Sequence, residues 1–68
     1  MKIIISNGNN ELLNALVHPK AHPRYIETEV ATDAALDFVE NFLGTQAVDQ
    51  IRAKVVPLPG WLKVRIEV

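Results

Sequence analysis

The sequence predicts one small α+β domain spanning residues 1–68, a two-layer sandwich with two to three helices covering one side of a three-stranded sheet. Apolar and polar residues alternate over Tyr25–Ala31 and Trp61–Val68, a pattern typical of half-buried strands. Between Thr32 and Val55 the apolar residues recur at helical spacing instead. The expected element order is strand, helix, strand, helix, helix, strand.

The chain opens on a short β-branched run, Lys2–Ser6, whose unbroken apolar character predicts a strand covered on both faces and central in the sheet. Asn7-Gly8 then supplies a turn, and this dipeptide is also favoured in hairpins. The following segment does not alternate as a strand does, and an asparagine there can cap a helix. We therefore expect a short helix over Asn10–Val17. Its apolar face would consist of Leu12, Leu13, Leu16 and Val17.

The segment from His18 to Pro23 carries two prolines and is expected to be a loop, because proline lacks a backbone donor. His18 and His22 are four residues apart, the spacing of a helical metal-binding pair. Each of them precedes a proline, so the helical geometry behind that spacing is missing. A metal-dependent function, completed by Glu27 or Glu29, is kept as a third hypothesis.

The strand over Tyr25–Ala31 is expected to point Ile26, Thr28 and Val30 to one face and Tyr25, Glu27 and Glu29 to the other. If this strand pairs with the last one, Glu27 and Glu29 would oppose Lys63 and Arg65 on the exposed face. Such opposite charges stabilise a cross-strand pair.

The longer helix is expected to begin with Thr32 as its cap and Asp33 beside the positive end of its dipole. One broad apolar arc runs along it: Ala35, Leu36, Phe38, Val39, Phe42 and Leu43. If the helix covers the sheet, Phe38 and Phe42 share one core with Val64.

A second helix is expected after Gly44, a favourable residue just past a helix end. Thr45 can cap it and Pro57 stops it. Its buried side would consist of Ala47, Val48, Ile51 and Val55. The rigid Pro57–Gly60 turn then leads into the last strand, where Trp61, Lys63, Arg65 and Glu67 point away from Leu62, Val64, Ile66 and Val68.

Composition argues against several functional classes. The net charge is −1 with scattered basic residues, whereas a nucleic-acid binder usually shows a basic face. The longest apolar run, Ile3-Ile4-Ile5, is far too short to cross a bilayer or act as a signal peptide. There is no cysteine for a disulfide or a common structural zinc site. We expect a cytoplasmic protein that binds neither nucleic acid nor membrane.

Catalytic signatures are missing as well. Ser6 is the sole serine and lacks the glycine pattern of a nucleophile elbow. The three glycines, at positions 8, 44 and 60, draw neither a phosphate loop nor a dinucleotide fingerprint. We therefore expect no enzyme activity and no cofactor.

Two surfaces remain as candidates for binding another protein. Leu58 and Trp61 flank a rigid turn, and preorganised apolar anchors of this kind make good interface hot spots. The alternative is that both cover one end of the core, although the strand alternation favours an exposed Trp61. The second candidate is the polar sheet face, to which Tyr25, Glu27, Glu29, Lys63 and Arg65 would contribute.

The segment from Tyr25 to Val68, a strand leading into a Thr-Asp-x-Ala helix and returning as a strand, resembles several small phage-encoded proteins. These include inhibitors of host RNA polymerase and of CRISPR effectors. The resemblance is one of pattern and carries no site residues across, but it implies an inhibitor or regulator that occupies a surface of a larger protein. The alternative is a homodimer or larger homo-oligomer, whose function arises only on assembly.

Overall fold

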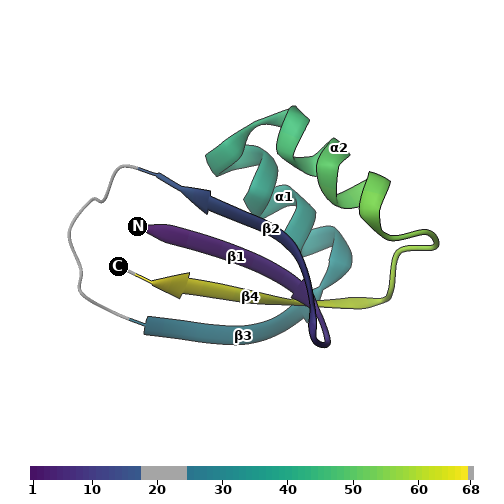
Figure 1. Ribbon diagram of the computed structural model, residues 1–68, viewed down its shortest axis with the longest axis horizontal. Coiled ribbons are helices and arrows are strands. Elements are labelled where there is room, and N and C mark those ends of the chain that lie inside the picture. The colour runs from purple at the N-terminus through teal and green to yellow at the C-terminus, as the bar shows by residue number, and fades with distance from the viewer. Residues whose placement is uncertain (18–24, 68) are drawn as a thin grey trace.

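The computed structural model describes residues 1–17 and 25–67. They form an α+β structure in which a four-stranded antiparallel sheet, ordered β2-β1-β4-β3, carries both helices on one side (Figure 1). In chain order the elements are β1 (Lys2–Asn7), β2 (Asn10–Leu16), β3 (Tyr25–Ala31), α1 (Thr32–Leu43), α2 (Thr45–Lys54) and β4 (Trp61–Glu67). The prediction of an α+β architecture is confirmed, while the predicted three strands and their order are wrong in detail.

The difference lies in Asn10–Val17, where the expected helix is strand β2. Asn7 pairs with Asn10, so β1 and β2 form a hairpin closed by the two-residue loop Gly8-Asn9. Gly8 has a φ of 60°, the positive value that the favoured two-residue hairpin turns require at their first central position. The hairpin continues to the chain start, where the backbone amide of Val17 donates to the Met1 carbonyl over 2.8 Å.

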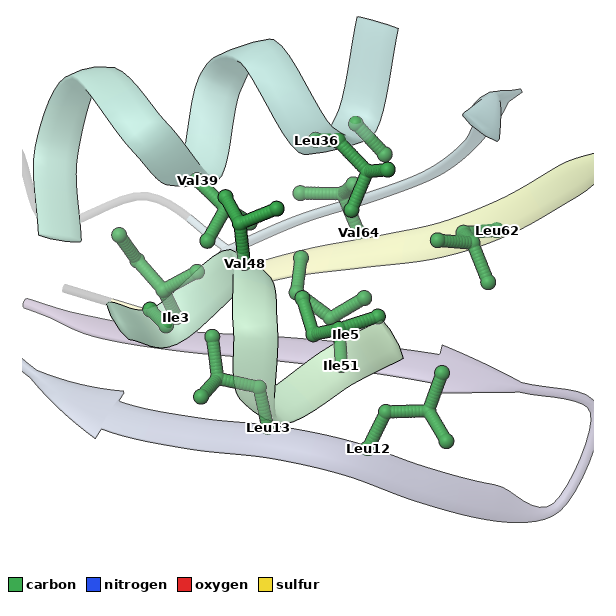
Figure 2. Close-up of a cluster of buried hydrophobic side chains, with 12 residues drawn as sticks. Ile3, Ile5, Leu12, Leu13, Leu36, Val39, Val48, Ile51, Leu62 and Val64 are labelled. Atoms are coloured by element: carbon green, nitrogen blue, oxygen red, sulfur yellow. The ribbon is translucent and has the colours of Figure 1, made fainter. Parts of the chain in front are cut away.

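A β-bulge explains why β2 does not alternate in sequence. Ile5 pairs with Leu13 and Ser6 pairs with Glu11, which leaves Leu12 as the extra residue of the strand. As a result Leu12 and Leu13 both point to the helix side and both are buried (Figure 2). Two adjacent buried leucines resemble the apolar face of a helix in the sequence. Leu16, which was expected to belong to that face, is 82% exposed.

Strand β1 is central, as predicted, and lies between β2 and β4. The expectation that both of its faces are covered is wrong. Ile3 and Ile5 face the helices and are fully buried, whereas Ile4 points to the other side and is only half-buried. None of the described elements packs on that second side, which we call the open face (Figure 1).

Strands β3 and β4 agree with the predicted pattern. They pair antiparallel over their full length, with Glu27 opposite Arg65 and Glu29 opposite Lys63. His18 and His22, which come between β2 and β3 in the sequence, lie outside the described residues, as do the rest of the predicted loop over His18–Pro23 and Val68. The hypothesis of a histidine metal site is therefore untested by this structure.

The helix starts differ from the expected threonine caps. The residue before α1 is Ala31, and Thr32 is already its first, buried residue. The Thr32 hydroxyl donates to the Pro59 carbonyl, and its backbone amide donates to the Gly60 carbonyl over 3.0 Å. These two bonds fasten the start of α1 to the turn before β4.

The junction between the helices is a single residue, Gly44. It has a φ of 88° and a ψ of 174°, a backbone conformation that is essentially restricted to glycine. It precedes α2 in place of the expected Thr45 cap, since Thr45 is the first helical residue. Gly44 also ends α1, where its backbone amide donates to the Glu40 carbonyl over 3.0 Å.

The core lies between the sheet and the two helices (Figure 2). Helix α2 lies over β2, and α1 lies over β4 and β3. Within the described residues, the core contains twelve buried apolar residues: Ile3, Ile5, Leu12, Leu13, Ala35, Leu36, Val39, Ala47, Val48, Ile51, Leu62 and Val64. Phe42 is not among them: it is 56% exposed, and its ring contacts Phe38 with centroids 4.8 Å apart. Its predicted place in one core with Val64 is therefore wrong.

Candidate functional site: the open sheet face

The open face exists because both helices pack on the other side of the sheet. Strand alternation places Lys2, Ile4 and Ser6 of β1 on it, together with the odd-numbered residues of β4. The antiparallel register then aligns them with the neighbouring strands. One row across the sheet reads Asn14, Ile4, Arg65, Glu27, and the next reads Glu11, Ser6, Lys63, Glu29.

Charge is ordered in columns on this face. Lys63 and Arg65 form a basic column on β4, and Glu27 and Glu29 form an acidic column beside it on β3. On the far side, across β1, Glu11 adds a further carboxylate. The predicted opposition of two carboxylates and two cations is therefore confirmed.

One ion pair joins the two columns diagonally, from β4 to β3, and a second lies along β4. Lys63 Nζ lies 3.6 Å from Glu27 Oε1, and Arg65 Nε lies 3.1 Å from Glu67 Oε2. All four side chains keep about two fifths of their surface in water or slightly less. Exposed pairs of this kind contribute ~0–1 kcal/mol to stability.

A shallow hollow of about 240 Å³ lies on the face toward the β1–β2 turn, where Gly8 and Asn9 contribute to its lining. Ile4 and Ser6 contribute to its lining from β1, Lys63 and Arg65 from β4, and Glu11 and Glu27 from the edge strands. Small-molecule sites usually enclose ~300–1,000 Å³ and are mostly apolar. This hollow is smaller and lined by charge, so it suits a protruding polar side chain better than a bound metabolite.

Trp61 is the large apolar residue at one end of the face. It is 62% exposed, which confirms the exposure that strand alternation predicts. Its cross-strand neighbour is Ala31, whose single methyl group covers little of an indole ring. Leu58 behaves differently: it is half-buried and packs against the core. Of the two predicted anchors, Trp61 is the exposed one; Leu58 covers one end of the core, and its contact with a partner stays a prediction.

Tyr25 takes the first position of β3, opposite Glu67. The structure therefore brings Lys63, Arg65, Glu27 and Glu29 together on one face, with Trp61 at its end. Sequence reasoning missed Ile4, Ser6 and Glu11 because β1 was expected to be covered and β2 to be helical. The signal that could have revealed them is the Asn-Gly-Asn-Asn run, residues 7–10, between two apolar segments.

The described residues contain no group of three or more histidine, cysteine or acidic side chains placed to hold a metal ion. No helix within 1–17 and 25–67 is both long and apolar enough to cross a membrane. Comparison with protein-family models, with curated proteins and with solved structures finds no match. The function must therefore be argued from the surface of the chain itself.

Proposed function

We propose that this protein is a small binding module, an inhibitor or regulator that acts by occupying a surface of a larger protein. The observation that carries the proposal is an open sheet face that ends in Trp61, a residue 62% exposed. Tryptophan is enriched among interface hot spots. The resemblance in pattern to small phage-encoded inhibitors suggests host RNA polymerase or a CRISPR effector as the kind of partner.

The dimensions of the molecule support this role. A stable protein interface buries about 800 Å² on each partner, and this chain has 4663 Å² of accessible surface. An interface of standard size would therefore cover about a sixth of the molecule. The open face can contribute to such an interface without any change in the core, because the helices pack on the other side of the sheet.

The charge columns support selective binding. A partner that matches them must place acidic groups over Lys63 and Arg65 and basic groups over Glu27 and Glu29. Complementary patterns of this kind raise association rates and disfavour wrong partners. The ion pairs of Lys63 with Glu27 and of Arg65 with Glu67 restrict three of these four side chains before binding, which lowers the entropy lost on association.

Site-specific photocrosslinking in a lysate of the source cells tests the proposal. A benzophenone amino acid replaces Trp61 in one variant and Phe42 in the other, because both residues are exposed aromatics, 62% and 56%, on different layers of the fold. We expect a specific adduct with a larger protein from position 61 only. Reversing the basic column with Lys63→Glu and Arg65→Glu should abolish it. The same adducts from both positions, or none from position 61, would contradict the proposal.

Assembly into a homo-oligomer is the second candidate, and one observation favours it. Leu16 is 82% exposed at the end of edge strand β2, where it offers an apolar contact to a second copy. Sedimentation velocity at micromolar concentration distinguishes the two candidates. A dimer that dissociates in the Leu16→Lys variant would support assembly, and a wild-type monomer would exclude it.

A further inference from the structure

The two edges of the sheet differ in regularity. Strand β2 carries the bulge at Leu12, and a bulge disrupts the ladder that a new strand would need. Strand β3 pairs with β4 through all seven of its residues without any register shift. It contains neither proline nor lysine, the residues that most often block an edge. Within the described residues, no strand pairs with its outer side.

A second copy of the chain is a poor occupant of this edge. Antiparallel pairing of two copies about Thr28 places Glu27 of each copy opposite Glu29 of the other. Pairing about Glu27 or about Glu29 places that carboxylate opposite itself. Like charges directly opposite one another are destabilising, so the three registers that pair the middle of β3 with itself are disfavoured while its backbone stays suited to pairing.

We propose that the outer edge of β3 accepts an extended segment of the partner protein as a fifth strand, with Lys or Arg at the positions facing Glu27 and Glu29. The inference rests on the proposed function and specifies the partner. The order of charge across the sheet supports it, because the basic column of β4 is followed by the acidic column of β3. A basic strand would continue that alternation, and each opposite-charge pair would stabilise it.

The other side of β3 specifies the remaining positions of the partner strand. Ile26 is 48% exposed on the helix side and Thr28 is exposed too. Apolar residues that alternate with the basic ones would cover Ile26 and lie beside it in the same layer. The expected segment is therefore extended, with basic and apolar residues in strict alternation.

A synthetic heptapeptide of alternating valine and lysine, acetylated and amidated at its ends, tests the edge directly. Titration into isotope-labelled protein, followed by amide NMR, should shift and protect amides of β3 and leave those of β2 unchanged. Two control peptides separate the contribution of charge from that of the strand hydrogen bonds. Glutamate in place of lysine reverses the charge, and N-methylation of alternate peptide bonds removes the strand hydrogen bonds but keeps the charge. Neither control should bind.

The matched protein variant is Glu27→Gln combined with Glu29→Gln, which keeps the shape of both side chains. Two cross-strand charge pairs correspond to roughly 2- to 30-fold in affinity, and the variant should lose that much. Unchanged far-UV circular dichroism confirms that it is folded. Equal binding of the N-methylated peptide, or protection at β2 instead of β3, would overturn the proposal.

Failure of this inference can be told apart from failure of the proposed function. If position 61 yields the adduct while the heptapeptide neither shifts nor protects the amides of β3, the open face binds without the β3 edge. The edge inference is then wrong while the proposed function stands. If the heptapeptide protects the amides of β3 and also competes with formation of the adduct at position 61, both are supported.

Discussion

Replacing a side chain by alanine should cost very different amounts of stability at the two ends of the apolar arc on α1. Leu36 is 6% exposed, whereas Phe42 is 56% exposed. Full burial of a phenylalanine contributes about 1.5–3 kcal/mol, so the covered part of Phe42 accounts for about 0.7–1.3 kcal/mol. Its contact with the Phe38 ring adds about 0.5–1.5 kcal/mol, and alanine regains about 0.5 kcal/mol through its helix propensity. Phe42→Ala should therefore cost roughly 1–2 kcal/mol.

Leu36→Ala creates a cavity in the core and should cost about 2–5 kcal/mol. A chain of 68 residues is expected to have about 3–10 kcal/mol of stability in total. The Phe42 variant should thus remain folded, while the Leu36 variant should be marginal. Urea unfolding followed by far-UV circular dichroism measures both on the same scale. An unfolded Phe42→Ala variant, or one that loses as much as Leu36→Ala, would refute the assignment of the helix face.

Three further substitutions test other parts of the structure. Trp61→Ala should shift the melting temperature by only a few degrees because the residue is 62% exposed. Blue-shifted Trp61 fluorescence in the wild-type protein that iodide does not quench would contradict this. Gly44→Ala should cost roughly 1–3 kcal/mol through backbone strain at its φ of 88°. At Gly60, where an added Cβ also meets no other atom, substitution by alanine should change the free energy of unfolding by no more than ~0.5 kcal/mol. If thermal melts show equal losses of stability in the Gly44 and Gly60 variants, backbone strain is not the cause. Thr32→Val removes the donor to the Pro59 carbonyl and should cost about 1 kcal/mol in chemical denaturation; a neutral result would show that this bond does not stabilise the helix start.

Elements with simple periodicity were predictable from the sequence. Tyr25–Ala31 and the last strand alternate without interruption, and the structure has strands at both. Asn10–Val17 was not predictable in this way, because the bulge adds Leu12 to the buried side and breaks the period of two. Periodicity also overestimated the buried arc of α1. A helical wheel places Phe42 beside the buried residues, but it does not indicate how far along the helix the sheet extends.

The candidate site was predictable only in the half that β3 and β4 form. The alternation of these two strands identifies Glu27, Glu29, Lys63 and Arg65 from local pattern alone. The contribution of β1 depends on which of its faces the helices cover, and a run of three isoleucines does not reveal that. Leu58 shows a similar limit, since a turn residue next to a strand has no period from which its burial can be inferred.

The order β2-β1-β4-β3 also has a consequence for how the chain folds. Strand β4 lies between β1 and β3 in the sheet but follows both in the sequence, and Lys2 pairs with Glu67. Before residues 61–67 emerge, the chain holds one hairpin and an isolated strand, and a lone hairpin is at best marginally stable in water. Folding must then wait for contacts between the most distant strands, which makes it slow for a chain of this size. Until β4 inserts, the inner edges of β1 and β3 are exposed to other chains, so a nascent or truncated form should be the most aggregation-prone state of this protein.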